Sequence, residues 1–445
     1  MRKLLTKGIV LSVITVLALT GCSSNKGGEA APGPSSSQPA GEKQTITFYH
    51  GYFQDDWQAA VEMRKIYDEF AELHKDEFTF KPVALDTGGE GVYNKAIQEI
   101  ARGEFPDIVD VGGWNIIPAA SEAGVIVDLK PYIDADPVFK EGVGINYEQN
   151  NMDGKIYSVR EQLETMGFWY NEDLFIKAGA VTPDKWQTWD DFSAAVDKIS
   201  ASNDVKTPFS MNQGWPTDIL FNAHLIGTQE GRDFASQLPT SFDNAAFKNT
   251  IEFISKNALG KIKTQYFGAA DSESYRDDFM NGDSAMLFNG VWEAGSFLEL
   301  TKVKPEHIKP AVFPTNEAGK KAALVSASPG YVISNKQGDE KIQASVEFVK
   351  YMMSPEIAER IFTKVLAMPA YSGLDYEKYI NGSDAGLKKL AEASMQAANA
   401  DYKTKALGAN WNPDIAGALS GKYAAMHNGS KDVESIVKEL NEALQ

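Results

Sequence analysis

The spacing of apolar and polar residues beyond position 44 predicts strands and helices in alternation. Residues 45–50 alternate between the two classes with period two, as a half-buried strand does. From Trp57 to Ala71, apolar residues recur every three or four positions, which is typical of an amphipathic helix. We expect Trp57 to pack on the buried face of that helix.

The following segments extend this pattern into a βαβαβ unit. Residues 78–85 read as a strand, and residues 93–102 read as a helix that Gly103 closes. Residues 107–111 form the short apolar run of a buried parallel strand. The pattern thus predicts an α/β fold in which ligands bind beyond the carboxyl ends of the strands.

Three loops follow those strand ends, at residues 51–54, 86–90 and 112–115. Sugar rings have apolar faces that stack on aromatic side chains and hydroxyl rims that need oriented polar partners. Both kinds of side chain occur in these loops: Tyr52, Phe53 and Trp114 are aromatic, and Asp86, Glu90 and Asn115 are polar.

The N-terminal residues predict export and lipid attachment. Three basic residues and an apolar run at positions 8–19 precede Leu19-Thr20-Gly21-Cys22, the order of a bacterial signal peptide. The apolar run is too short for a typical membrane span. Cys22 is the single cysteine of the chain, so lipidation (palmitate) explains its position better than a disulfide. We predict a signal peptide at 1–21 and a lipid anchor to the cell membrane, on its extracytoplasmic face, at Cys22.

Composition predicts a tether followed by two domains. Residues 22–43 are rich in Ser, Gly, Pro and Ala, which favours a disordered tether. Loss of residues 1–21 moves the formal charge from -18 to -21, an acidic balance that argues against nucleic acid as a partner. The roughly 400 remaining residues exceed what one hydrophobic core normally serves, so we expect two domains.

Five motifs appear in order along the rest of the chain. Residues 153–157 read DGKIY, and residues 168–175, after Glu164, read FWYNEDLF. Residues 188–192 read TWDDF, with a Thr N-cap and an acidic residue three positions on. Residues 279–292 carry Gly, then Ala-Met, then Gly-x-Trp, and residues 328–334 and 344–361 read as a strand and a helix. Together these segments resemble extracellular solute-binding protein family 1, the sugar-binding lipoproteins similar to maltose-binding protein.

This resemblance implies a two-lobed periplasmic-binding-protein-like fold with a hinge and a ligand cleft. The N-terminal lobe would comprise 44–162 plus 328–368, and the C-terminal lobe 163–327 plus 369–445. Crossovers would lie near Glu161, Ala327 and Ala367. One departure is that residues 159–162 read VREQ where the family usually has a proline, which affects the hinge contacts.

The resemblance also implies a function. The protein would be the substrate-binding component of an ABC sugar importer, a monomer that captures a carbohydrate, delivers it to the membrane permease and catalyses no reaction. The family's sugar contacts would fall on Trp114, Asn115, Glu164, Trp215 and Trp292. Tyr331 and Trp411 are further candidates, whereas we expect Trp169, Trp186 and Trp189 to lie in the core.

Two other functions stay open from the sequence. A protein of the same fold could bind a polyamine or an anion, although an anion site favours clustered Arg or Lys. An exported glycoside hydrolase would need two carboxylates across the scissile bond, for which Glu161 and Glu164 are candidates. No cofactor or metal is indicated, because the five histidines are far apart and residues 271–273 lack the rest of a calcium loop.

Overall fold

The computed structural model describes residues 43–86, 88–113, 115–268, 274–411 and 413–444. The predictions for the signal peptide, Cys22 and Trp114 fall outside these ranges, as do those for residues 271–273 and nearly all of the tether. Residues 43–445 form one compact unit by their internal contacts. Among the described residues, no helix has the length and apolar character to cross a membrane.

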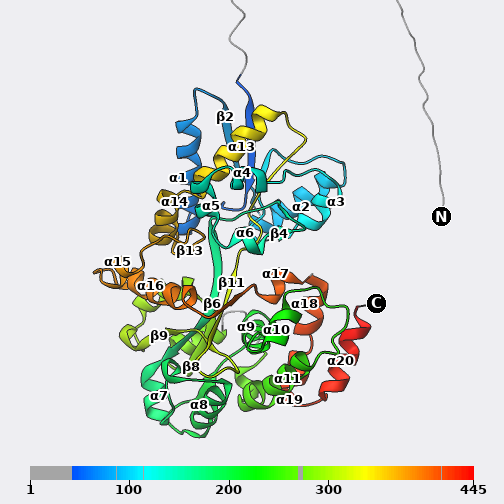
Figure 1. Cartoon of the computed structure of the whole chain (residues 1–445). Coiled ribbons are helices and arrows are strands. Elements are labelled where there is room, and N and C mark those ends of the chain that lie inside the picture. The colour runs from blue at the N-terminus through cyan, green and yellow to red at the C-terminus, as the bar shows by residue number, and fades with distance from the viewer. Residues whose placement is uncertain (1–42, 87, 114, 269–273, 412, 445) are drawn as a thin grey trace, which may run out of the picture. The chain divides into compact units, whose positions relative to one another are not determined.

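The first segments of the chain form a four-stranded sheet in the order β12-β3-β1-β2 (Figure 1). β1 (Thr45–His50) pairs in parallel with both β2 (Thr79–Ala84) and β3 (Ile108–Asp110). β12 (Tyr331–Ile333) returns from much later in the chain and pairs antiparallel with β3. The predicted βαβαβ unit is therefore confirmed, with β1 in its centre.

Aromatic rings fill the space between this sheet and its helices. The ring of Phe48 lies 4.9 Å from that of Tyr67 on α1 (Gln58–Leu73). It also lies 4.8 Å from that of Phe348 on α13 (Asp339–Met352). The expected burial of Trp57 was wrong: Trp57 is the N-cap of α1 and is 49% exposed, because it precedes the first turn and leaves the buried stripe of the helix.

The second sheet is built around β6 (Gln162–Asn171), in the order β10-β11-β6-β8-β7. β8 (Ser284–Gly290) and β11 (Lys321–Ser326) flank β6, and both run antiparallel to it. The other strands are β7 (Thr207–Phe209), β9 (Ile308–Ala311), β10 (Phe313–Pro314), β13 (Met368–Pro369) and β14 (Tyr402–Thr404).

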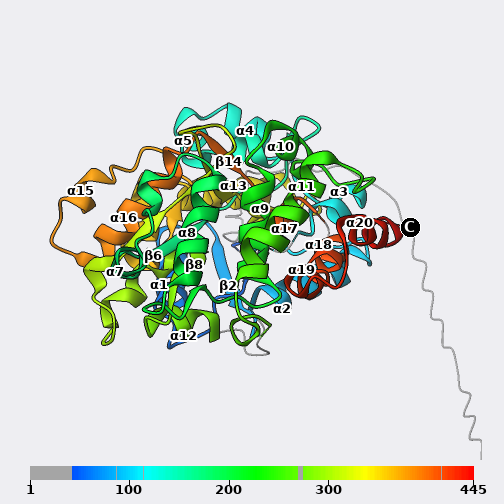
Figure 2. The same cartoon turned by 90° about the horizontal axis from the view of Figure 1, so that it is seen from below.

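Helices pack around the second sheet, and their local sequences explain where they begin. Thr188 and Asp191 form the predicted capping box of α8 (Trp189–Ala201). α9 (Trp215–Leu225) and α11 (Ala245–Phe253) pack against each other, and α20 (Val433–Glu442) lies near the C-terminus (Figure 2). Burial of three tryptophans is confirmed: Trp169, Trp186 and Trp189.

Three connections join the two sheets, and they are paired with one another at the start of β6. Ser326 of β11 pairs with Glu164, and Pro369 of β13 pairs with Gln162. The Gln149 side chain donates to the Val325 carbonyl and accepts from the Ala327 amide, both at 2.8 Å. The start of β6 is therefore where the two halves of the fold are joined by hydrogen bonds.

Candidate functional site

Three cavities meet at Glu164, the third residue of β6. Cavity A, of about 480 Å³, is bounded by Tyr52, Trp57, Gln162, Glu164, Trp292 and Leu366. Cavity B, also about 480 Å³, is bounded by Tyr93, Gly113, Asn115, Glu164, Pro329 and the segment 408–411. Cavity C, about 140 Å³, lies beside Glu164, Trp215, Asn222, Leu324, Ser328 and the segment 406–409. Each cavity takes walls from both halves of the fold.

The position of Glu164 is fixed by an ion pair and by a close backbone approach. Arg160 Nη1 donates to Glu164 Oε1 at 3.1 Å. Gly113 sits opposite with a φ of +93°, and a Cβ there would lie 3.0 Å from Glu164 Oε1. Only glycine adopts this backbone conformation without strain. The loop after β3 is thereby held against the carboxylate, which stays about one third exposed to the cavities.

Two tryptophans form an exposed aromatic platform next to Glu164. The rings of Trp215 and Trp292 lie 5.9 Å apart with 32° between their planes, and the residues are 39% and 38% exposed. Trp215 is the first residue of α9, and Trp292 lies in η5 (Val291–Glu299), directly after β8. The Trp292 ring covers Gly290, where an added Cβ would meet the ring at 2.2 Å. The Gly-x-Trp motif thus places the indole flat against the backbone.

Two carboxylates are buried in the protein close to the start of β6. Glu161 and Asp110 are each 2% exposed. Burial raises the pKa of Glu161 to about 7, and the neighbouring Asp110 carboxylate adds to the rise. Neither oxygen of Glu161 has a hydrogen-bond partner in the protein. Glu161 lines none of the three cavities, so it is not placed with Glu164 as the two carboxylates that glycoside hydrolysis requires.

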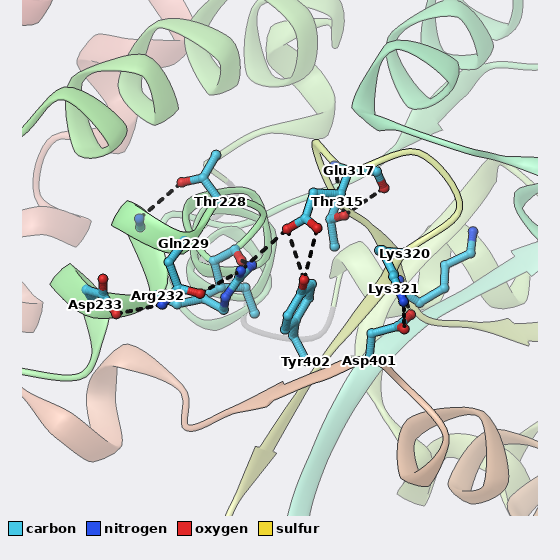
Figure 3. A network of polar contacts seen from close by, with 12 residues as sticks. Thr228, Gln229, Arg232, Asp233, Thr315, Glu317, Lys320, Lys321, Asp401 and Tyr402 are labelled. Carbon is cyan, nitrogen blue, oxygen red and sulfur yellow. Dashed lines mark hydrogen bonds and ion pairs between the residues drawn. The ribbon is translucent and has the colours of Figure 1, made fainter.

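A polar network surrounds Asp401 and Tyr402, at the start of the segment that leads to cavities B and C (Figure 3). The Tyr402 hydroxyl of β14 donates to the Glu317 carboxylate at 2.9 Å, and Arg232 Cζ lies 3.6 Å over the Tyr402 ring. Asp401 pairs with Lys320 at 2.7 Å. β14 leads directly into the residues 406–409 that line the cavities. This network therefore positions one wall of the site.

The structure brings several of the predicted ligand-binding residues together around these cavities. Tyr52, Glu164 and Trp292 line cavity A, Asn115 lines cavity B, and Trp215 lines cavity C. Tyr52 is held by Gln162, whose side-chain amide donates to the Tyr52 hydroxyl at 2.8 Å.

Other candidates are placed elsewhere. Tyr331 is fully buried, with its ring 6.0 Å from that of Phe48, so it belongs to the core and faces no cavity described above. Trp411 borders cavity B but is 3% exposed, because it packs against Phe234 and Phe242. Three candidates from the loops are exposed and line none of the three cavities: Phe53, Asp86 and Glu90.

Sequence reasoning missed several cavity residues. Arg160 and Gln162 lie in the VREQ segment that departs from the family pattern, and that departure was the available signal. Trp57 was assigned to the core on helical periodicity, yet it lines cavity A. Asn222 and the segment 406–409 carried no signal, because a single Asn within a helix and a run of small residues are common in any fold.

The cavities thus combine aromatic faces with a small number of oriented polar groups. This combination suits a neutral polyhydroxylated ligand better than an anion, because the Arg160 guanidinium is already paired with Glu164. Among the described residues, no cluster of three or more His, Cys, Asp or Glu side chains is arranged to hold a metal ion.

This chain is similar to known bacterial solute-binding proteins. Residues 65–375 match the model of a bacterial extracellular solute-binding protein family. The arabinooligosaccharide-binding protein of Bacillus subtilis is 26% identical over 303 residues, which cover 67% of this chain and 65% of that protein. The multiple sugar-binding protein of Streptococcus mutans is 22% identical over 90% of this chain and 88% of that protein.

A solved structure matches with higher sequence identity over a similar share of the chain. It is a Streptococcus pneumoniae solute-binding protein in complex with the blood group A-trisaccharide, and it is 34% identical. The alignment covers 90% of this chain and 99% of that one, with a TM-score of 0.76. The expected α/β fold, similar to two-lobed solute-binding proteins, is confirmed by this match.

Proposed function

We propose that this chain, which belongs to the bacterial extracellular solute-binding proteins, captures a carbohydrate outside the cytoplasm and delivers it to an ABC-type importer. The family itself implies the extracytoplasmic location and a transport role. The observation that carries the carbohydrate assignment is the exposed Trp215–Trp292 platform beside the Glu164 carboxylate. Relatives named for sugar binding support it.

The side chains where the cavities meet would contact different parts of the sugar. The indoles of Trp215 and Trp292, with the Tyr52 and Trp57 rings across cavity A, offer apolar faces to sugar rings. Glu164 accepts hydrogen bonds from sugar hydroxyls, and Asn115 contributes an amide at the edge of cavity B. Three cavities sharing one residue suit an oligosaccharide better than a single sugar unit.

Lobe closure is the proposed mechanism of capture. The lobes would be 44–162 plus 328–368 and 163–327 plus 369–445, with the hinge at the paired connections beside Gln162. A ligand that touches Tyr52 in one lobe and Trp292 in the other stabilises the closed arrangement, because only there are both contacts made. Small-angle scattering tests this mechanism: saturating ligand should reduce the radius of gyration, and an unchanged radius would count against closure.

The remaining parts of the proposal concern anchoring and energy supply. A signal peptide at 1–21, a lipid on Cys22 and a tether at 22–43 would hold a monomeric binding protein at the membrane surface. Mass spectrometry of the membrane-extracted protein would detect the lipid on an N-terminal Cys22. We assign no catalytic activity to this chain; ATP hydrolysis belongs to other subunits, since the sequence contains no Walker motif.

Tryptophan fluorescence of the purified protein against a panel of neutral mono- and oligosaccharides tests the function. A saturable change with one class of sugar, reduced in Trp215→Ala and in Trp292→Ala, is the expected result. If no sugar of the panel changes the fluorescence of a protein that has a native circular dichroism spectrum, a non-sugar solute, such as a polyamine, is favoured as the ligand of the same site.

A further inference from the structure

Cavity C differs in chemistry from the two larger cavities beside it. Its walls are mainly aliphatic, from Met166 and Leu324 on the sheet, Ile219 on α9, Leu407, and Leu419 on α18 (Pro413–Ser420). Helices α9, α17 (Leu407–Asn410) and α18 lie close together in Figures 1 and 2, and all three contribute residues to the cavity wall. Concave aliphatic walls do not suit a hydroxyl-bearing sugar rim, which would lose its hydrogen bonds there.

One polar atom in this apolar wall has no protein partner. Asn222 is 2% exposed, and its side-chain Oδ1 accepts no hydrogen bond. The neighbouring Asp218 is already used, because its Oδ1 accepts from the Ser420 and Tyr423 hydroxyls at 3.0 and 2.6 Å. A buried acceptor without a donor is unfavourable, so a bound group that supplies one N–H or O–H to it would gain affinity.

The size of cavity C limits what can enter. Its volume of about 140 Å³ is close to the roughly 150 Å³ of an apolar protein cavity that binds benzene. A small planar substituent therefore fits, whereas a whole sugar unit with its hydroxyl groups is larger. Trp215 and Glu164, beside which we place the sugar, also line cavity C.

We infer that cavity C is a subsite for the acylamino group of a 2-acetamido sugar, with its N–H donated to Asn222 Oδ1 and its methyl against the aliphatic walls. This inference rests on the proposed function and specifies the sugar class. A free amine offers no methyl group to the aliphatic walls, and its ionic partner would have to be Asp218, which already accepts hydrogen bonds from two hydroxyls.

Isothermal titration calorimetry of the purified protein with matched sugars provides the test. Each sugar of the panel is used in hydroxyl, acetamido and amino forms, for example cellobiose, diacetylchitobiose and chitobiose. The expected result is at least tenfold tighter binding of an acetamido form. Asn222→Leu removes the acceptor at similar size, and Ala416→Leu fills the cavity from α18; both should abolish the preference.

A matched control separates cavity filling from general disturbance of α18. Gly417→Leu adds a side chain on the same helix where a Cβ meets nothing within 4 Å, so it should keep the preference. Hydroxyl or amino forms binding as tightly as acetamido forms would overturn the inference and leave the proposed function intact. Binding of no sugar by the folded protein would overturn both.

Discussion

The Trp292 ring lies directly over Gly290, so close that a Cβ on residue 290 would sit 2.2 Å from the indole. This contact fixes the ring in the orientation that places it 5.9 Å from the ring of Trp215. The ligand platform therefore depends on a glycine that would touch no ligand itself.

Gly290→Ala should weaken sugar binding while leaving the fold intact. The added methyl group must displace the Trp292 ring, because the backbone of β8 is held by pairing with β6. We expect a rise in Kd of about tenfold, equivalent to about 1.4 kcal/mol. Fluorescence titration measures the change. Leu73→Ala, at an exposed position on α1, is the control and should leave Kd unchanged. Wild-type affinity in Gly290→Ala would show that the ring orientation is unimportant.

Glu164→Gln should weaken sugar binding and lower thermal stability, whereas Asp86→Asn should change neither property. Glu164 borders all three cavities and pairs with Arg160. The substitution replaces one acceptor oxygen with an NH2 donor and removes the negative charge that faces the buried Arg160 guanidinium. We expect at least a tenfold loss of affinity and lower thermal stability. Asp86 is exposed and lines none of these cavities, so Asp86→Asn should change neither. The opposite ranking, measured by calorimetry and thermal unfolding, would favour a site on the loop after β2.

The buried Glu161 predicts a dependence of stability on pH. Its pKa rises from 4.5 in the unfolded chain to about 7 in the fold. Folding thus favours the protonated form, and the contribution of Glu161 to stability is full below pH 4.5 and declines as pH rises to about 7. Glu161→Gln stays neutral, so its stability relative to wild type should grow over that range, by up to about 3 kcal/mol.

Urea denaturation at a series of pH values measures this difference. The exposed Glu122→Gln on α3 (Ile117–Glu122) is the matched control and should show no such growth. A Glu161→Gln difference that is constant from pH 4.5 to 8 would mean that the carboxylate is already ionised in the fold at low pH.

Arg232→Met should destabilise the wall between cavities B and C. The guanidinium donates to the Ile226 carbonyl at 3.0 Å. It also lies over the Tyr402 ring, and both side chains are labelled in Figure 3. Loss of these contacts should lower the free energy of unfolding by about 1–3 kcal/mol and weaken sugar binding through β14. Lys320→Ala removes a half-exposed ion pair and should cost less than about 1 kcal/mol. Equal, small effects in denaturation would show that Arg232 is dispensable.

Periodicity and strand order predicted the first sheet well, because β1, β2 and β3 are local patterns that tertiary contacts did not override. The same reasoning failed for Trp57, since a helical spacing does not reveal that the first residue is a cap outside the buried stripe. Tyr331, expected among the ligand contacts, is instead fully buried, and Trp411 is buried although it borders cavity B. Whether an aromatic side chain packs inward depends on neighbours such as Phe48 and Phe242, which lie far away in the sequence.

The candidate site could be predicted only where the family resemblance or the end of a strand indicated a residue. The resemblance indicated Trp215, Trp292 and Glu164, which the structure places on the cavity walls. Asn222 and the segment 406–409 were not, because their importance comes from the cavity that they enclose with residues distant in the chain. A cavity arises from tertiary packing, and the residues that enclose it show no periodic pattern in the sequence.

Isothermal titration calorimetry tests sugar capture by the tryptophan platform most directly. The purified protein is titrated with the neutral oligosaccharide that gives the largest fluorescence response, and the Trp215→Ala/Trp292→Ala double variant is titrated in the same way. We predict a single saturable binding event in the wild type and at least a hundredfold weaker binding in the double variant with an unchanged circular dichroism spectrum. Equal affinity of the two proteins, or no heat with any neutral sugar, would contradict this assignment.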